Sequence, residues 1–516
     1  MPALTDGLNT QQLAAVKHEG SPLLVVAGAG SGKTRVLTRR IAYLLAERNV
    51  APYEVLAITF TNKAAGEMKE RVAQLVGDRA KMMWVSTFHS ACVRILRKEA
   101  SLLGYTNSFT IYDQSDSLRL ITLVMRDMNL DAKRYAPRAV ASLISQAKNE
   151  LMGPADYLNQ AKDQFQEIVA QVFAIYQKRL TGANSMDFDD LIAKTVEVLQ
   201  RYPDARSKYR SRFKHILVDE YQDTNHAQYI LIKELVGSEI EGFPIAELCV
   251  VGDADQSIYA FRGANIRNIL QFEADYPNAK TILLEQNYRS TQNILNAANA
   301  VIANNDNRKE KNLWSDAGTG SMIIGHIAES EHDEADFVVR EIDRLRDLGS
   351  SNPGDTAIFY RTNAQSRVFE EVFMRVGIPY KVVGGVRFYE RKEIKDFLAY
   401  LRVIVNPNDE VSMRRIINTP KRGIGDRALD LVDLYAQANN LSFWQSLCEV
   451  EKNQEIAQRS SASLIEFVKL IQSLQTLVEA KTRPSVIAQA VLEQSGLLTE
   501  LSESKDPQDE VRVENL

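Results

Sequence analysis

The chain has 516 residues, of which 45% are hydrophobic and 25% charged, and its formal net charge at pH 7 is -5. This length is too great for one hydrophobic core and predicts several domains, while the hydrophobic content is that of an ordinary globular protein. The small negative net charge argues against a protein that coats nucleic acid by average charge alone, but a local DNA-binding groove remains compatible with it.

The N-terminal sequence and the cysteines indicate a cytoplasmic protein that is not inserted in a membrane. The sequence MPALTDGLN lacks the basic and apolar regions of a signal peptide, and no run of eighteen apolar residues follows. Three cysteines (Cys92, Cys249 and Cys448) lie far apart and form no CxxC pair. This spacing argues against a zinc site or a disulfide framework and fits a reducing compartment.

Apolar strands alternate with amphipathic helices along the chain, a pattern typical of parallel α/β sheets. The predicted strands of the first part, in chain order, are 23–26, 55–58, 82–85, 215–218, 248–251 and 281–284. The stretch from about residue 94 to 201 has helical periodicity and almost no strand signal, so it is predicted to be a helical insertion. A second α/β segment has predicted strands at 322–324, 357–360 and 380–383, and helices are predicted from about residue 391 onwards.

The strongest local signal is Ala27-Gly28-Ala29-Gly30-Ser31-Gly32-Lys33-Thr34, between a predicted strand and a predicted helix. Glycines allow backbone N–H groups to turn towards phosphate oxygens, and the following helix adds its positive N-terminal end. Lys33 is expected to reach the β- and γ-phosphates of a nucleoside triphosphate, and Thr34 to ligate Mg²⁺. The alternative is a glycine-rich turn without a ligand. The usual pattern begins with glycine, and this chain has Ala27 there.

A pair of carboxylates follows another predicted strand, in Asp219-Glu220-Tyr221-Gln222-Asp223. The carboxyl ends of parallel strands share one edge of a sheet, which is also the edge of the phosphate loop. Asp219 is expected to hold Mg²⁺ through water, and Glu220 to accept a proton from the attacking water. Taken alone, the pair could equally be an acidic, solvated turn, but with the phosphate loop it predicts an NTPase site.

Seven segments, in order, resemble the conserved motifs Q, I, Ia, Ib, II, III and IV of the UvrD, PcrA and Rep helicases of superfamily 1. These segments are LNTQQ at 8–12, AGAGSGKT at 27–34, TFTNKAA at 59–65, TFHS at 87–90, DEYQDTN at 219–225, VGDADQSIY at 251–259 and QNYRS at 286–290. The resemblance covers almost the whole chain. It implies an α/β fold of RecA-like P-loop NTPase parallel sheets with helical insertion domains.

The same resemblance implies roles around ATP. Gln12 would read the adenine edge, Tyr288 would stack on the base, and Arg35 would lie beside the phosphate loop. An amide offers both a donor and an acceptor, so Gln12 can favour ATP over GTP. Gln256 resembles the γ-phosphate sensor, and Arg289 resembles the first of two arginines that neutralise charge in the transition state. Without the resemblance, Gln12 would be a polar helix start and Arg289 a surface ion pair.

A DNA-binding surface is predicted from aromatic residues that follow strand ends or turns. Phe60, Tyr259 and Phe261 could stack on bases, which is worth roughly 1–3 kcal/mol per base and tolerates any sequence. The family usually has Trp where this chain has Phe261. Core packing is the alternative for each ring. By resemblance, further DNA contacts are expected from Asn62, His89, Arg262, Arg361 and Asn363, with Phe188 as a weaker candidate.

The resemblance also divides the chain into named domains. Domain 1A is predicted at 1–93 and 202–282, domain 1B at 94–201, the first part of domain 2A at 283–384, and a helical domain 2B at 385–516. The segment 384–391 matches the family's entry into domain 2B. Within that domain, the turn at 420–425 could touch duplex phosphates or simply connect two helices. Motifs V and VI, including a second arginine finger, are not found, so we expect the sequence to be a fragment of a longer motor.

These observations predict an ATP-dependent DNA helicase or translocase of DNA repair or replication, here as an incomplete motor. By resemblance its polarity is 3′ to 5′, its cofactors are ATP and Mg²⁺, and its partners are single-stranded DNA, DNA junctions and other repair proteins. Two alternatives stay open. One is a nucleotide-dependent DNA-binding fragment without appreciable turnover, and the other is an unrelated P-loop enzyme such as a small-molecule kinase.

Overall fold

The computed structural model describes residues 4–238, 245–305, 308, 310–383, 391–504 and 507–516. It separates into two compact units, one formed by residues 1–320 with 396–514 and 516, the other by 321–395 with 515. None of the helices in the described part of the chain has both the length and the apolar character of a membrane span. The predicted domain limits do not coincide with these units and remain predictions.

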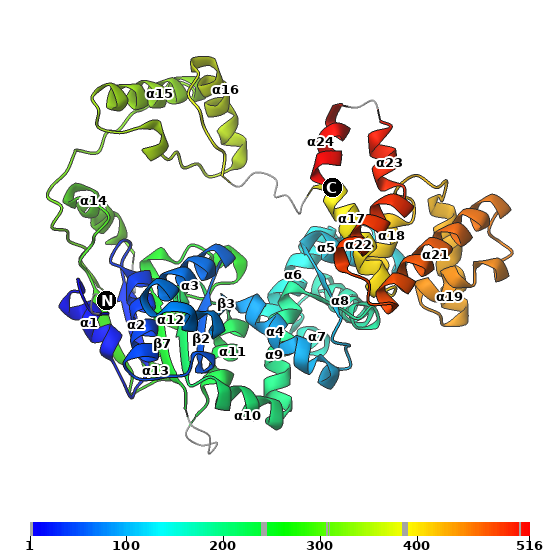
Figure 1. The fold of residues 1–516 in the computed structure, drawn as a ribbon, viewed down its shortest axis with the longest axis horizontal. Coiled ribbons are helices and arrows are strands. Elements are labelled where there is room, and N and C mark those ends of the chain that lie inside the picture. The colour runs from blue at the N-terminus through cyan, green and yellow to red at the C-terminus, as the bar shows by residue number, and fades with distance from the viewer. Residues whose placement is uncertain (1–3, 239–244, 306–307, 309, 384–390, 505–506) are drawn as a thin grey trace. The chain divides into compact units, whose positions relative to one another are not determined.

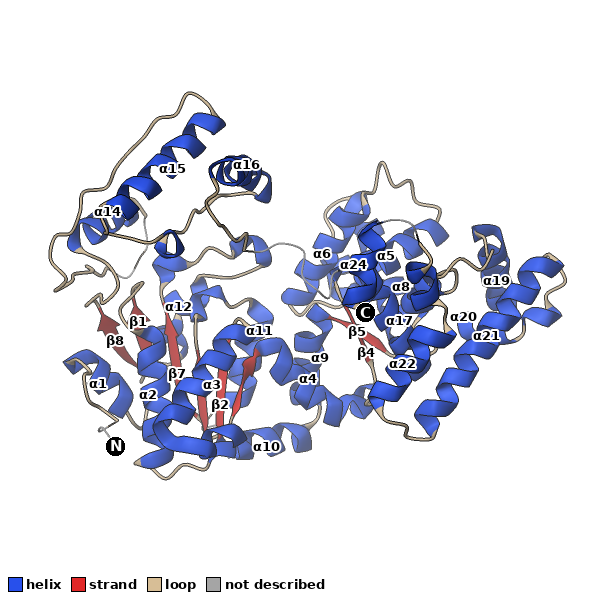
Figure 2. Cartoon of the chain, turned by 45° about the horizontal axis from the view of Figure 1, so that its top comes forward, coloured by secondary structure: helices blue, strands red, loops and turns tan. Residues whose placement is uncertain are grey.

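The first unit contains a six-stranded, fully parallel sheet (Figure 2). Its strands, in spatial order, are β3 (Trp84–Thr87), β2 (Val55–Thr59), β6 (His215–Val218), β7 (Glu247–Gly252), β1 (Leu23–Ala27) and β8 (Lys280–Leu284). All six strands predicted in this part of the sequence are confirmed, with ends shifted by at most two residues. The third begins at Trp84 because Gly77–Met82 forms a 3₁₀ helix.

Alternating side chains of β1, β2, β6 and β7 enter two separate cores, one on each face of the sheet. On β1, for example, Leu24 and Val26 belong to one core, and Leu23 and Val25 to the other. The helices around the sheet are visible in Figure 1. One core includes residues of α1 (Thr10–Lys17), α2 (Lys33–Ala46) and α3 (Asn62–Val76); the other includes residues of α4 (Phe88–Glu99), α9 (Phe188–Arg201), α10 (Pro203–Arg212), α11 (His226–Val236), α12 (Arg267–Leu270) and α13 (Phe272–Asp275).

This topology brings three functional segments to one edge of the sheet. Strands β6, β7 and β1 are consecutive neighbours and all run in the same direction. The phosphate loop follows β1, the carboxylate pair follows β6, and the segment that contains Gln256 follows β7. Lys33 therefore meets Glu220, 187 residues away in sequence, and Gln256, 223 residues away, at the carboxyl edge, as expected for this class of sheet.

The segment 94–201 is mainly helical, as predicted. Beyond α4 and α9 it contains α5 (Gln114–Asp127), α6 (Pro137–Asn149), α7 (Pro154–Gln160) and α8 (Gln164–Gly182). The prediction missed two short parallel strands, β4 (Thr110–Tyr112) and β5 (Ser185–Asp187). Three residues are too few to show a strand pattern in sequence, so this small sheet can be found only from the tertiary structure.

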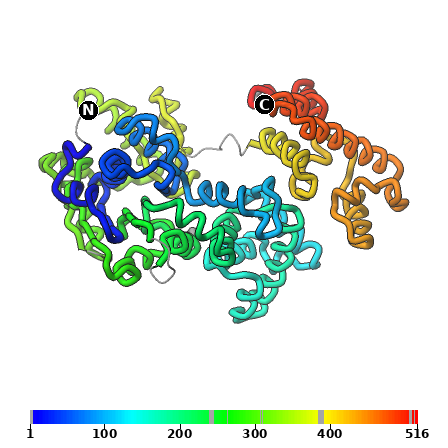
Figure 3. The backbone as a smooth tube through the Cα atoms, turned by 60° about the horizontal axis from the view of Figure 1, so that its bottom comes forward, coloured from blue at the N-terminus to red at the C-terminus, as the bar shows by residue number. Residues whose placement is uncertain are grey.

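A second helical bundle packs against this insertion within the same unit, and the tube in Figure 3 shows the two side by side. Asn406 donates hydrogen bonds to the carbonyl of Ala183 (2.8 Å) and to Thr110 (3.1 Å), and Tyr112 donates to Asp409 (2.6 Å). The predicted helices from about residue 391 are confirmed as α17 (Lys392–Val405), α18 (Glu410–Ile416), α19 (Asp426–Asn439), α20 (Phe443–Cys448), α21 (Gln458–Glu479), α22 (Pro484–Gln494), α23 (Leu497–Ser502) and α24 (Pro507–Asn515).

The prediction of strands at 322–324, 357–360 and 380–383 was wrong, because none of these segments is a strand in the structure. The second unit is built on α15 (Glu331–Asp347) and α16 (Ser366–Val376), which share a small apolar core. A strand exists only where a neighbour satisfies its backbone hydrogen bonds, and these segments pair with no described strand. Their apolar side chains are accordingly exposed: Phe359 is 93% and Val383 is 84% exposed.

Candidate nucleotide-binding site

The phosphate loop is a tight turn between β1 and α2. Gly30 has φ of 71° and Gly32, the residue before α2, has φ of 91°, a left-handed conformation that favours glycine. Ser31 is fully buried, and its hydroxyl donates to the carbonyl of Gly28 (2.8 Å). Gln12 is also fully buried and donates from Nε2 to the carbonyl of Ser31 (3.0 Å). The loop is thus shaped by its own residues and by a side chain of α1.

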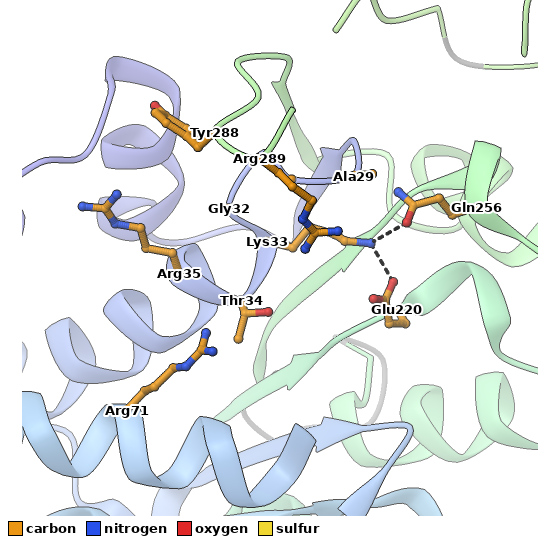
Figure 4. Close-up of a pocket in the computed structure, with 11 residues that line it drawn as sticks. Ala29, Gly32, Lys33, Thr34, Arg35, Arg71, Glu220, Gln256, Tyr288 and Arg289 are labelled. Atoms are coloured by element: carbon orange, nitrogen blue, oxygen red, sulfur yellow. Dashed lines mark hydrogen bonds and ion pairs between the residues drawn. The ribbon is translucent and has the colours of Figure 1, made fainter. Parts of the chain in front are cut away.

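Lys33 connects the phosphate loop to the two catalytic candidates that follow β6 and β7. Its Nζ donates to Oε2 of Glu220 at 2.8 Å and to Oε1 of Gln256 at 3.5 Å (Figure 4). Glu220 has φ of 50°, which is uncommon for a residue with a side chain and is often found at functional sites. The side chains of Lys33 and Glu220 are 12% and 36% exposed, so the pair lies at the wall of an open pocket.

The neighbouring carboxylate, Asp219, is nearly buried, with 6% of its surface exposed. Burial, together with the charge of Glu220, raises the pKa of Asp219 to about 6. Its Oδ1 accepts a hydrogen bond from the backbone N–H of Glu220 (3.1 Å). A cation beside a buried carboxylate stabilises its ionised form, which burial disfavours. The environment of Asp219 therefore fits a ligand of Mg²⁺.

The opposite wall comes from the segment after β8. The side chain of Asn287, 3% exposed, donates to the carbonyl of Ala29 (2.5 Å) and accepts from the backbone N–H groups of Arg289 (2.8 Å) and Ser290 (2.7 Å). The backbone N–H of Tyr288 donates to the carbonyl of Gly30 (2.9 Å). These contacts tie the predicted base-stacking and arginine residues directly to the phosphate loop.

A cavity of about 330 Å³ lies between these walls, within the 300–1,000 Å³ typical of ligand sites. Figure 4 shows side chains that extend into it from the phosphate loop, from α3 and from the segment after β8. Its lining includes most of the nucleotide-site residues predicted from sequence: Ala29, Gly30, Gly32, Lys33, Thr34, Arg35, Glu220, Gln256, Tyr288 and Arg289. The roles of these residues remain predictions.

Five predicted residues do not line the cavity: Gln12, Ala27, Gly28, Ser31 and Asp219. Ala27 is the buried end of β1, and the amide of Gln12 is occupied by the backbone of Ser31 and of Asn9. Arg71 of α3 also lines the cavity but was not predicted from the sequence. It lies mid-helix in an exposed, charged stretch and no sequence signal separates it from an ordinary surface arginine.

The aromatic candidates for DNA binding differ in exposure. Tyr259 and Phe261 are 37% and 71% exposed, with ring centroids 6.0 Å apart, just beyond Gln256. Phe60 is half-buried and its ring lies edge-on to Phe88 at 5.8 Å, so it also packs on a core. Phe188 is 47% exposed. The first two rings therefore fit a stacking surface best.

The structure describes the side chains of four of the five polar residues predicted to bind DNA. Asn62 is exposed at the start of α3, and His89 lies edge-on to Phe188 at 5.5 Å. Burial lowers the pKa of His89, which favours a neutral ring. Arg361 and Asn363 are exposed but belong to the second unit, and the side chain of Arg262 lies outside the described ones. Their contacts with DNA stay predictions.

Two predictions concern the bundle after residue 390. The entry segment 384–391 lies outside the described residues except for Arg391. The turn at 420–425 connects α18 and α19, and the backbone N–H groups of Arg422 (2.7 Å) and Ile424 (3.4 Å) donate to Oδ1 of Asn418. Because both N–H groups are satisfied internally, the structure favours a helix–helix connection over a phosphate contact.

A glycine-rich loop between a parallel strand and a helix, a lysine at the helix start and carboxylates at the end of another strand of the same sheet together define the class of P-loop NTPases. Two family models match this chain: the UvrD/REP helicase N-terminal domain over residues 8–277 and the UvrD-like helicase C-terminal domain over residues 282–516. The chain therefore belongs to the UvrD/REP helicase family.

Relatives agree with this assignment. The chain is 57% identical over 520 residues to the ATP-dependent DNA helicase UvrD1 of Mycobacterium tuberculosis, with 99% of this chain and 67% of that protein covered. It is 56% identical over 524 residues to the UvrD1 of Mycobacterium leprae, with the same coverage. It is 50% identical over 519 residues to the ATP-dependent DNA helicase PcrA of Staphylococcus aureus, with 100% of this chain and 70% of that protein covered.

Proposed function

We propose that this chain is part of an ATP-dependent DNA helicase. It binds Mg²⁺·ATP in the cavity beside the phosphate loop, and it couples the binding and hydrolysis of this nucleotide to the binding of single-stranded DNA. Lys33 and Arg289 neutralise phosphate charge, Tyr288 stacks on the base, and Glu220 accepts the proton of the attacking water. Glu220 can act as a base only after Lys33 has moved from its carboxylate to the phosphates. The ion pair between them is thus the resting state of the site.

The observation that carries the proposal is the position of Gln256. Its side chain lies 3.5 Å from Lys33 inside the cavity, and the exposed rings of Tyr259 and Phe261 follow three and five residues later. The same short segment therefore touches the nucleotide site at one end and offers aromatic rings to solvent at the other. A small-molecule kinase has no need for that arrangement, whereas a motor that senses DNA does.

The donor groups at the site fit Mg²⁺. Thr34 and Asp219 offer a hydroxyl and a carboxylate, which are hard oxygen ligands, and Mg²⁺ usually binds through one or two such groups together with substrate phosphates and water. Among the described residues, no group of three or more His, Cys, Asp or Glu side chains is placed to hold a metal ion. We propose that the ion binds together with the nucleotide phosphates. When bound, it would neutralise charge on the β- and γ-phosphates.

The finer parts of the proposal come from the family resemblance. They are the 3′-to-5′ polarity, action at DNA junctions in repair or replication, the cytoplasmic location and the partition into domains 1A, 1B, 2A and 2B. Asn62, His89, Arg262, Arg361 and Asn363 are proposed to add polar contacts to the strand held by the aromatic rings.

The test is a titration of the purified chain with a fluorescent ATP analogue and Mg²⁺, with and without a single-stranded oligonucleotide, followed by a hydrolysis assay. We expect nucleotide binding that the oligonucleotide alters. Binding without any measurable hydrolysis would favour the alternative of a nucleotide-dependent DNA-binding protein. Nucleotide binding that is indifferent to DNA would overturn the proposal and favour an unrelated P-loop enzyme.

A further inference from the structure

A buried ion-pair cluster lies beside the cavity but outside its lining. Asp253, directly after β7, is 2% exposed, and Lys311, in the segment after α14 (Gln292–Ile302), is 6% exposed. The ammonium of Lys311 contacts Asp253 and lies 2.5 Å from Asp255. Arg308 adds a second cation, 3.3 Å from Asp255. A lysine is rarely this buried unless it is paired, so the cluster is a specific part of the fold.

Asp253 uses its two carboxylate oxygens for different partners. Oδ1 faces Lys311, and Oδ2 accepts a hydrogen bond from Nε2 of Gln256 at 2.5 Å. Because a carboxylate can only accept, it selects the NH₂ side of the Gln256 amide. The Oε1 of Gln256 is consequently turned towards Lys33 and the cavity. The orientation of the proposed γ-phosphate sensor is therefore set by Asp253.

Asp253 is itself held in place from two sides. Its backbone N–H donates to Oε1 of Gln222 (2.9 Å), and Nε2 of Gln222 donates to Glu220 (3.0 Å). The position of Asp253 is thus linked to the catalytic carboxylate through one amide side chain. Lys311 supplies the positive charge that this buried carboxylate needs from the other side.

The position of Lys311 is fixed independently of its ion pairs. Two residues further on, Leu313 packs on the phosphate loop, where a Cβ added to Gly28 would lie 2.3 Å from it. The backbone of Trp314 pairs with Glu285 (3.2 Å) and Asn287 (2.8 Å). A side-chain change at Lys311 should therefore leave the path of this segment intact.

We propose that Lys311 is a positioning residue for Gln256, acting through Asp253. Through this contact, the segment that follows α14 helps to orient the side chain that recognises the γ-phosphate. This inference rests on the proposed role of Gln256 at the nucleotide site. Without Lys311, the buried carboxylate of Asp253 would keep two neutral donors, the backbone N–H of Asp255 and the amide of Gln256, but would lose its cationic partner. It would then draw in water or another donor, and Gln256 would lose its preset orientation.

The test compares affinities for ADP and for the non-hydrolysable triphosphate AMP-PNP, both with Mg²⁺, so that it does not depend on turnover. Lys311→Met should reduce the preference for the triphosphate by roughly tenfold, the effect of one charge-assisted hydrogen bond, and leave ADP affinity unchanged within about threefold. Lys311→Arg keeps the cation and should retain most of the preference. Lys214→Met removes a lysine that pairs with Glu54 (2.5 Å) outside the cluster and should change neither affinity.

The proposal also predicts non-additivity with Gln256→Ala. If Lys311 acts through Gln256, the double variant should show the same preference as Gln256→Ala alone. Additive losses, or an unchanged preference in Lys311→Met, would overturn the inference while leaving the proposed function standing. If Lys311→Met unfolds, a full loss of preference in folded Lys311→Arg would overturn it. A wild-type chain that binds neither nucleotide would instead refute the proposed function.

Discussion

Replacement of Glu220 by Gln tests whether the ion pair between Lys33 and Glu220 must break before a triphosphate binds. In the structure Lys33 donates to the Glu220 carboxylate, and a bound triphosphate must draw Lys33 away from it. Gln is nearly isosteric with Glu but carries no charge, so Glu220→Gln frees Lys33 and also removes a negative charge next to the γ-phosphate position. We therefore expect this variant to bind Mg²⁺·AMP-PNP more tightly than the wild type and to lose ATP hydrolysis.

The size of the effect follows from the exposure of the pair. With side chains 12% and 36% exposed, the pair is partly screened, and exposed ion pairs contribute roughly 0.2–1 kcal/mol. We take the upper end, about 1 kcal/mol, which corresponds to about fivefold tighter binding. Affinity can be measured by fluorescence titration with a labelled triphosphate, and turnover by phosphate release.

The matched control is Glu54→Gln, which removes the same charge from a lysine pair outside the cavity. It should leave nucleotide affinity unchanged. Weaker binding by Glu220→Gln would show that the carboxylate assists ATP binding, and retained hydrolysis would show that another group is the base. The first result would refute the reasoning about the Lys33–Glu220 ion pair, and the second would refute the role of Glu220 as the base.

Three further predictions concern stability, the phosphate loop and DNA. Burial alone would raise the pKa of Glu247, but His215 (3.2 Å) and Arg48 (2.7 Å) hold it well below its ordinary value. The ionised form of Glu247 therefore stabilises the fold at pH values above the pKa of the unfolded chain, about 4.3. Glu247→Gln should lower the free energy of unfolding by about 2 kcal/mol at pH 7, measured by denaturant titration. This difference between variant and wild type should shrink as the pH falls below about 4. Asn287→Ala should weaken AMP-PNP binding about tenfold in a fluorescence titration, because the side-chain hydrogen bond to the carbonyl of Ala29 in the phosphate loop is lost, together with those from the backbone N–H groups of Arg289 and Ser290. Phe261→Ala should weaken binding of a single-stranded oligonucleotide by roughly 1–3 kcal/mol in an anisotropy assay.

Each of these three predictions would be contradicted by a specific result. A pH-independent effect of Glu247→Gln between pH 3 and 7 would show that charge is not involved. Full nucleotide affinity in Asn287→Ala would mean that the loop keeps its shape alone. Tyr53→Ala removes a 53% exposed ring located before β2, and an equal loss of DNA affinity there would show that Phe261 has no specific role.

The sequence predicted the central sheet well because strands such as β1, β2 and β6 are buried on both faces and appear as continuous apolar runs. The runs at 322–324, 357–360 and 380–383 look the same in sequence but are not strands, since strand formation depends on a neighbour that local sequence does not specify. The second unit therefore differs most from the sequence prediction, because most apolar side chains of the segments predicted to pair are exposed there.

The phosphate loop and the acidic pair were predictable because strand ends place such segments at one edge of the sheet. The Asp253–Lys311 pair was not, because Lys311 occurs in the polar stretch NNDNRKEKN at 304–312, which reads as a solvated loop. The main-chain pairing of Trp314 with Glu285 and Asn287 holds the segment that brings this lysine to Asp253, at the end of β7. Long-range placement of this kind has no local signal.

The most direct measurement is a structure of the chain crystallised with Mg²⁺ and AMP-PNP. We predict a triphosphate along the phosphate loop, with Lys33 moved from Glu220 to the phosphates and Asp219 and Glu220 facing the metal and the γ-phosphate. A nucleotide bound elsewhere, or one bound in the cavity with the Lys33–Glu220 pair intact, would contradict the claim that these groups form one triphosphate site.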